Sequence, residues 1–188
     1  MKKIIIIEIA LLFTLIASCS KIKQIANINV DIPYSAQSAL PEIPGIIAGY
    51  GLPPGGISLP FPAIPVATNS KQYISQYHTA ANMIIDVYLK QLSLQIVSPP
   101  NQNFDFLDSV QVYISAPTQP ELLVANEYNI PKGQTALNLS TNTNVNLKKY
   151  FVQDTIYFRI QGHINAIPAS GTLFNLQSVF HLLANPLN

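Results

Sequence analysis

Histidines and aspartates are the residue types in this 188-residue chain that acid–base chemistry or metal binding would use. Two of the three histidines, His163 and His181, lie in alternating segments that we expect to pair as a hairpin, with Arg159 opposite His181. At ~3.3 Å per residue, His163 and His181 would then stand about 13 Å apart along the strand, too far to share a metal ion. His78 has no obvious partner. We therefore predict no metal site and no cofactor.

Asp105 and Asp108 are close enough in the sequence to suggest a carboxylate pair for general acid–base catalysis. Asp105 falls on the polar side of the expected strand, whereas Asp108 shares the parity of the apolar residues. Because a buried unpaired carboxylate is costly, we expect Asp108 to sit at a β-bulge or to bond nearby backbone amides. The motif Ser20-Lys21-Ile22-Lys23 matches the nucleophile motif of penicillin-binding enzymes, but its companion motifs are missing. We predict that the protein is not an enzyme.

The N-terminus has the parts of a secretory signal. Lys2 and Lys3 make its start positive, an apolar run follows over residues 4–17, and small residues precede Cys19. The run is shorter than the roughly 20 apolar residues that cross a bilayer, and Glu8 interrupts it. We predict that residues 1–18 are a signal peptide and not a transmembrane anchor.

The four residues Ile16-Ala17-Ser18-Cys19 resemble the lipobox of bacterial lipoproteins. The resemblance implies that the signal is removed before Cys19, that the thiol carries lipid such as palmitate, and that the protein is tied to a membrane. Two or three acyl chains would hold it permanently, since each buried methylene contributes about 0.8 kcal/mol. Residues 19–25 would form a tether whose last six residues span at most about 20 Å at ~3.4 Å per residue.

The residues after Cys19 bear on which membrane holds the protein. Ser20 is not the aspartate that keeps lipoproteins at the inner membrane of enteric bacteria, and no acidic cluster follows it as in surface-exported lipoproteins of the Bacteroidetes. We expect the outer membrane, on its periplasmic side. The general pattern of the chain is similar to small Bacteroidetes lipoproteins.

Two tripeptides resemble the O-glycosylation signal that Bacteroidetes use on exported proteins. They are Asp108-Ser109-Val110 and Asp154-Thr155-Ile156. The resemblance implies glycans on Ser109 and Thr155, whose side chains both fall on the outward parity of their strands.

The charge of the chain argues against a nucleic-acid partner. The chain has 10 basic and 9 acidic residues, and removal of residues 1–18 leaves eight of each. Arg159 is the only arginine, and no basic cluster is present, whereas nucleic-acid binding needs clustered Lys and Arg. With Cys19 as the only cysteine, no disulfide can form within the domain.

Alternation of apolar residues predicts seven or so strands. They cover residues 26–34, 57–63, 85–96, 104–114, 121–127 and 135–141, and the two arms of a C-terminal hairpin, 156–166 and 174–184. Prolines at every second position make 57–63 an edge strand. Ile85, Val87 and Leu89 are expected to face the core together. The apolar parity changes between Leu89 and Leu92, which predicts a β-bulge at Lys90–Gln91. Ala169-Ser170-Gly171 fits a three-residue hairpin loop.

Helical structure is expected in two places only. Asn69 or Ser70 can cap a helix of about three turns, with apolar residues at helical spacing as far as Ile84. A helical turn is expected over residues 145–151. Residues 36–56, rich in proline and glycine, are expected to form a long loop.

These elements predict one domain, residues 26–188, that is mainly β: an antiparallel β-sandwich of the immunoglobulin-like class with one short helix. We expect a non-enzymatic binding or structural protein of the cell envelope, with an envelope protein or a glycan as its partner. Two alternatives remain open: a carrier of lipid or another apolar ligand, and a subunit of a fimbria-like surface assembly.

Overall fold

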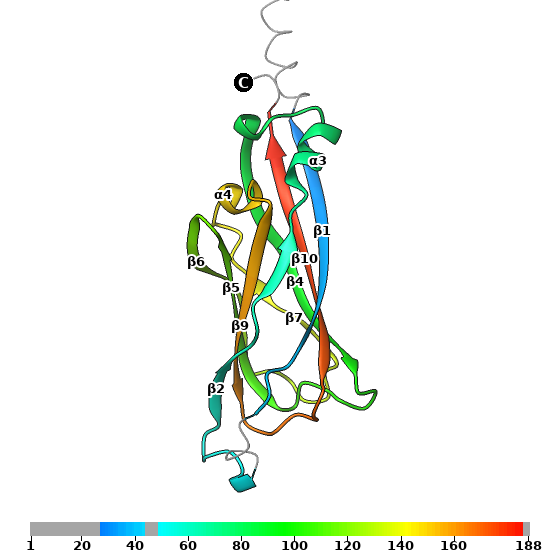
Figure 1. Ribbon diagram of the computed structural model, residues 1–188, viewed down its shortest axis with the longest axis vertical. Helices are drawn as coiled ribbons and strands as arrows, with labels where there is room; N and C mark the ends of the chain where they lie inside the picture. The colour runs from blue at the N-terminus through cyan, green and yellow to red at the C-terminus, as the bar shows by residue number, and fades with distance from the viewer. Residues whose placement is uncertain (1–26, 44–48, 186–188) are drawn as a thin grey trace, which may run out of the picture.

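Two antiparallel sheets pack face to face in the computed structural model, which describes residues 27–43 and 49–185 (Figure 1). The first sheet has the strand order β1-β10-β4-β7. The second has the order β2-β9-β5-β6-β8, and β3 also pairs with β9. The predicted signal peptide 1–18, the lipobox-like residues with Cys19, and the predicted tether 19–25 lie outside the described residues.

The strands of the first sheet are β1 (Ile28–Ala39), β10 (Leu173–Ala184), β4 (Ile84–Ser98) and β7 (Ala136–Asn138). Those of the second are β2 (Ile57–Pro60), β3 (Ile64–Ala67), β9 (Thr155–Ile164), β5 (Leu107–Ala116), β6 (Gln119–Tyr128) and β8 (Ser140–Thr141). The short helices are α3 (Ser70–Gln76), η1 (Ala81–Met83) and α4 (Lys148–Phe151). Among the described residues, no helix has the length and apolar character needed to cross a membrane.

The predicted mainly-β antiparallel sandwich with little helix is confirmed. Its strand connectivity is that of a jelly roll, a double sheet built from Greek keys. The first strand, β1, pairs with the last, β10, and β4 lies on the other side of β10. In the immunoglobulin arrangement that we expected, the first strand pairs with the second instead. Alternation of apolar residues shows which face of a strand is buried, but it does not show which strand lies beside it. The sequence therefore did not distinguish the jelly-roll connectivity from the immunoglobulin one.

One continuous core fills the space between the sheets. Phe180 on β10 and Phe158 on β9 come from opposite sheets, and their ring centroids lie 6.4 Å apart. Tyr34 on β1 meets Phe180 edge to face at 5.7 Å. Aromatic pairs in this geometry stabilise a core beyond the area they bury.

The pairing of β4 with β10 has three register shifts, and two of them bear on predictions made from the sequence. The predicted bulge is confirmed: Leu89 pairs with Phe180 and Gln91 with Val179, so that Lys90 is skipped. A second shift skips Ile85. It turns Ile84 inward and leaves Ile85 45% exposed, so the expectation that Ile85 faces the core was wrong.

The predicted C-terminal hairpin was also wrong. β9 and β10 lie in different sheets, where β9 pairs with β5 and β10 pairs with β1 and β4. Arg159 therefore lies opposite Tyr113, and His181 lies between Asp31 and Tyr88. The connection from residue 165 to residue 172 crosses from one sheet to the other, which strand alternation alone cannot reveal.

Several element bounds also differ from expectation. β1 runs on to Ala39, so the expected loop 36–56 begins later. The expected edge strand 57–63 ends at Pro60 as β2, and a separate strand, β3, follows from Ile64; both pair with β9. The segment 135–141 also divides, since β7 joins the first sheet and β8 the second. Helix α3 ends at Gln76, because a positive φ of 50° at His78 takes the chain out of the helical conformation.

Replacing Phe180 by alanine is expected to lower the free energy of unfolding by about 3–5 kcal/mol, because it leaves a cavity where the Phe180 ring packs between the two sheets. Urea denaturation measures the change. The matched control is Ile85→Ala, whose exposed side chain should contribute within about 0.5 kcal/mol. Equal losses in the two variants would contradict the placement of these residues.

Candidate functional site

A group of polar and aromatic side chains, most of them joined by hydrogen bonds, lies on the outer face of the second sheet. We call this surface the Arg159 face. Its members come from the neighbouring strands β9, β5 and β6: Gln111, Tyr113, Tyr128, Tyr157, Arg159 and Gln161. Arg159 lies opposite Tyr113, and Gln161 lies opposite Gln111. The inward residues of the same strands are buried, so this face is the side that the core does not use.

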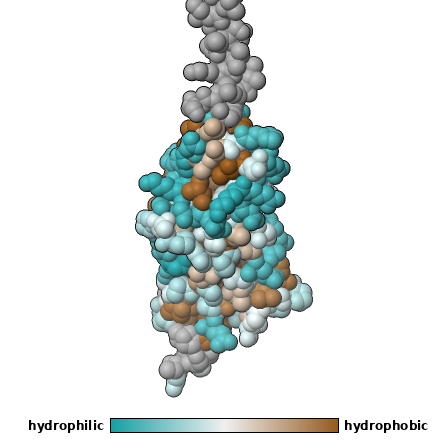
Figure 2. Space-filling view, turned by 45° about the horizontal axis from the view of Figure 1, so that its top comes forward, coloured by the Kyte–Doolittle hydropathy of each residue, from teal (hydrophilic) through white to brown (hydrophobic). Residues whose placement is uncertain are grey.

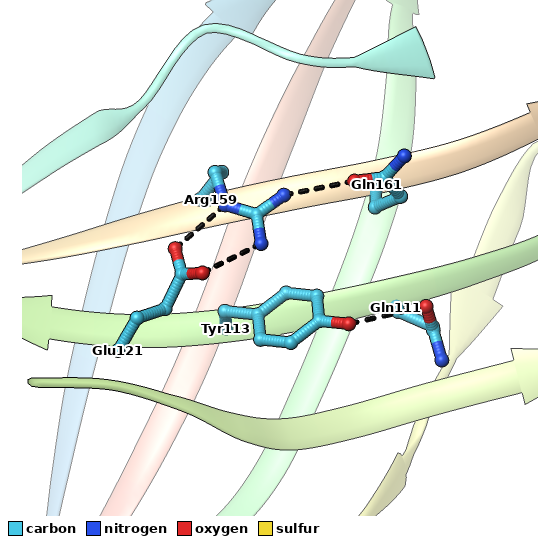
Figure 3. Close-up of polar contacts among 5 residues, drawn as sticks. All are labelled: Gln111, Tyr113, Glu121, Arg159 and Gln161. Atoms are coloured by element: carbon cyan, nitrogen blue, oxygen red, sulfur yellow. Dashed lines mark hydrogen bonds and ion pairs between the residues drawn. The ribbon is translucent and has the colours of Figure 1, made fainter. Parts of the chain in front are cut away.

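Arg159 is the centre of the group (Figure 3). Its Nε and Nη2 atoms donate to the two carboxylate oxygens of Glu121, at 2.6 and 2.7 Å. Its Nη1 atom donates to Gln161 Oε1 at 2.9 Å. The guanidinium carbon lies 4.3 Å from the centroid of the Tyr113 ring. These contacts hold the guanidinium plane in one position.

The ion pair with Arg159 also changes the acidity of its partner. The hydrogen bond from Arg159 lowers the pKa of Glu121, against a smaller opposing effect of burial. Glu121 therefore keeps its charge and balances that of Arg159.

A second chain of hydrogen bonds continues from Tyr113 across the sheet. The Tyr113 hydroxyl donates to Gln111 Oε1 at 3.2 Å, and Gln111 Nε2 donates to the Tyr128 hydroxyl at 3.1 Å. The second amide of the face, Gln161, has its oxygen taken by Arg159. Because arginine only donates, this contact fixes which end of the amide is oxygen. Within the described chain, Gln161 Nε2 has no hydrogen-bond partner, so it is free to donate to a ligand.

His163 adjoins this face but has a structural role. Its Nδ1 lies 3.2 Å from Ser58 Oγ, and its Nε2 lies 2.7 Å from the carbonyl oxygen of Gly55. A Cβ on Gly56 would come within 2.2 Å of the Ile164 carbonyl oxygen, so only glycine allows the chain to pass this close. Through its contacts with Ser58 and Gly55, His163 holds the start of β2 and the residues before it against strand β9. The sequence does not indicate this contact, because 105 residues separate Ser58 from His163.

The other predicted histidine, His181, lies on the outer face of the first sheet. Its Nδ1 contacts Asp31 Oδ1 at 2.7 Å, and Lys90 Nζ contacts Asp31 Oδ2 at 2.5 Å. The hydrogen bonds from Lys90 and then His181 lower the pKa of Asp31. Tyr88 stacks against His181 with ring centroids 4.9 Å apart. This is a surface ion-pair network, and a sandwich of two sheets separates it from His163.

The two aspartates considered for catalysis are held apart in separate local structures. Asp105 Oδ1 accepts the backbone N–H of Gly133 at 2.5 Å, and Oδ2 accepts the Asn103 side chain at 3.1 Å. Asp108 lies at a register shift in β5, which confirms the predicted bulge, and it accepts a hydrogen bond from the Asn165 side chain. Within the described residues, no group of three or more His, Cys, Asp and Glu side chains is placed to hold a metal ion.

The two residues proposed for O-glycosylation are both half-buried on strands of the second sheet. Ser109 lies between His163 and Tyr128 in the register of the sheet, next to the Arg159 face. Thr155 is the first residue of β9 and pairs with Ala67 of β3. Cys19 lies outside the described residues.

Two hollows lie at the β2 end of the molecule. One, of about 340 Å³, lies between residues 40–43 and 167–172 at the β2 end of the molecule. The other is lined by apolar side chains that include Leu59, Phe61 and Phe106 and has a volume of only about 10 Å³, which is room for about one water molecule.

Comparison with known proteins finds similar structures but no family. No protein-family model and no curated protein matches the chain. Structural matches include a chain of infectious bursal disease virus, Gt strain, which is 10% identical with a TM-score of 0.36. They also include chains of Desmodium yellow mottle tymovirus (10%, TM-score 0.27) and turnip yellow mosaic virus (11%, TM-score 0.26).

The matches cover most of this chain but differing shares of the others. They cover 85%, 84% and 84% of this chain, and 32%, 88% and 93% of the respective viral chains. This chain therefore spans about a third of the length of the first viral chain.

The ion pair at the centre of the Arg159 face predicts a pH dependence. The pKa of Glu121 is lower in the folded protein than in the unfolded chain. The ion pair therefore stabilises the fold at pH values above the ordinary carboxyl pKa. This stabilisation is lost as the pH falls through the pKa that Glu121 has in the folded protein. Glu121→Gln should reduce stability by at most about 1 kcal/mol near pH 7, because the pair is partly exposed. The difference from wild type should shrink below about pH 4.

Urea denaturation at pH 7 and pH 3 measures this difference. Glu42→Gln serves as the control, because Glu42 is an exposed carboxylate at the β2 end of the molecule. A loss in Glu121→Gln that is the same at both pH values would rule out the ion pair as its origin.

Proposed function

We propose that this protein is a lipid-anchored, non-enzymatic binding module of the bacterial cell envelope, and that the Arg159 face is its binding surface. The observation that carries the binding role is the hydrogen-bonded group around Arg159, which is ordered, outward-facing and not needed by the core. Polar groups held in place before a ligand arrives reduce the entropy lost on binding.

The position of the strand ends supports an anchor at one end of the sandwich. Ile28 pairs with Ala184, so β1 begins where β10 ends, beside α3 (Figure 1). β2 and the connection between β9 and β10 lie at the opposite end. A chain tethered through Cys19 would have its α3 end toward the membrane. Ser20–Asn27 would then span at most about 27 Å at ~3.4 Å per residue, and the sheet faces would stay open to the periplasm.

The surface itself also suits a binding role better than a carrier role. Figure 2 shows hydrophilic and weakly polar side chains over much of the middle of one side, with apolar patches nearer the two ends. An apolar carrier needs an apolar cavity of hundreds of Å³. The apolar hollow beside Phe61 holds about 10 Å³, and the hollow of about 340 Å³ at the β2 end is lined by polar residues such as Glu42 and Ser170 as well as by apolar ones. The interior between the sheets is occupied by large side chains such as Phe158 and Phe180.

The fimbria-like alternative needs an open sheet edge that accepts another strand. The gap between β1 and β3 is bridged at Tyr34, which donates to the Thr68 carbonyl oxygen and meets Tyr73 of α3 edge to face at 6.3 Å. Beside β4, the backbone N–H groups of Leu139 and Leu147 bond to the strand. These contacts oppose strand insertion at both places.

A Cys19→Ala variant is expected to lose membrane attachment, because it removes the thiol that would carry the lipid. Fractionation of cells that produce the full chain, with a salt wash and a detergent phase partition, measures the attachment. Ser20→Ala is the matched control and should stay with the membrane. Retention of the Cys19→Ala variant in the detergent phase would refute the anchor.

Glycosylation of Ser109 and Thr155 is tested by intact mass. Protein from its native host should be heavier than the lipidated chain, and the excess should fall stepwise in Ser109→Ala and Thr155→Ala. Ser115→Ala, on the same outward side of β5 as Ser109, should leave it unchanged. A native mass that is explained by lipid alone would end this hypothesis.

A further inference from the structure

We propose that the ligand of the Arg159 face is an uncharged polysaccharide chain. This inference rests on the proposed binding role of that face and names the class of ligand. It follows from the shape of the surface, its charge, and the kinds of chemical group that it presents.

The face presents a row of side chains along strand β9, with further rows on the neighbouring strands β5 and β6. Tyr157, Arg159 and Gln161 follow one another on the outward side of β9, which sets them about 7 Å apart along the strand at ~3.3 Å per residue. β5 and β6 add Tyr113, Gln111 and Tyr128 alongside. An extended chain lying along β9 would contact these side chains in turn, whereas a small molecule would find no enclosing walls here.

Two exposed tyrosine rings stand at the ends of the polar centre. Tyr128 is 51% exposed and Tyr157 is 36% exposed. They lie on opposite sides of the Arg159 group, since Tyr128 is in register with Ser109 and Tyr157 with Ser115. A tyrosine offers an apolar ring face and a polar hydroxyl. Sugar rings have the matching character, with apolar C–H faces and hydroxyl edges.

The polar groups between these rings suit hydroxyls. Gln161 Nε2 is an unused donor, and the oxygen of the Gln111 amide and those of Glu121 keep lone pairs for further donors. A sugar hydroxyl both donates and accepts, so it can satisfy either kind of group. The existing hydrogen bonds keep the amides and the guanidinium in place, so that little side-chain freedom is lost on binding.

The charge of the face favours a neutral ligand over an anionic one. The only arginine of the chain is already paired to Glu121 through two hydrogen bonds, so it presents no net charge. An anionic polymer would have to compete with that carboxylate. A protein partner is disfavoured by the centre of the face, where an ion pair and a glutamine amide lie, because the buried core of a protein interface is more apolar and depleted of charged residues.

The test is affinity electrophoresis of the full chain, purified in mild detergent, through native gels that contain one polysaccharide each. The neutral probes are laminarin, galactomannan, arabinoxylan and starch, and the charged probes are polygalacturonate and heparin. At least one neutral polymer should retard the protein, and the charged ones should not. Tyr128→Ala, Tyr157→Ala and Gln161→Ala should each weaken that retardation about tenfold or more, the equivalent of about 1.4 kcal/mol.

The matched control is Tyr88→Ala, which removes a tyrosine from the outer face of the first sheet. It should be retarded like wild type, and circular dichroism of every variant checks the fold. The proposal is overturned if no neutral polymer retards the protein, if charged polymers retard it equally, or if the three variants behave like Tyr88→Ala. Failure of the polysaccharide proposal would not refute the proposed membrane anchor, because fractionation of the Cys19→Ala variant tests the anchor separately.

Discussion

The pairing of β10 with β1 on one side and β4 on the other is the constraint on which this structure depends. It joins the two ends of the described chain side by side in one sheet, with β1 at the sheet edge, and it places Phe180 between Tyr34 and Phe158. The first sheet therefore lacks one of its two inner strands until β10 is present. This contact also brings the start of β1 and the end of β10 to the same end of the sandwich, and so sets which end an N-terminal anchor would hold.

The core leaves the two outer faces free to differ. Both are made by the outward residues of strands whose inward residues are buried, yet their chemistry is different. On the first sheet, Asp31 joins Lys90 and His181 in a network of ionisable groups. On the second, Arg159 is neutralised by Glu121 and surrounded by tyrosines and amides. The binding function that we propose would accordingly be a property of a sheet face, where side chains are ordered by their neighbours on adjacent strands.

Local pattern was enough to place some irregular features. The change of apolar parity between Leu89 and Leu92 revealed the bulge at Lys90, and the cost of burying a lone carboxylate indicated the one at Asp108. The register shift at Ile85 was not predicted, because Ile84 and Ile85 are equally apolar and either could face the core. The sequence did not predict the Arg159 face either. The sequence placed Arg159 on an outward side but set it opposite His181, so its true neighbours Tyr113 and Glu121 did not enter the argument.

The sequence by itself determined the mainly-β class, most of the strands and which of their side chains point inward, because burial of one face repeats every two residues along a strand. It also carries the N-terminal features from which the anchor is inferred. Only the tertiary structure decided which strands are neighbours, since pairing depends on how connections cross between the sheets and not on the pattern within any strand. β9 and β10 alternate as two arms of a hairpin would, and the fold separates them into different sheets, where β9 meets β5 and assembles the Arg159 face.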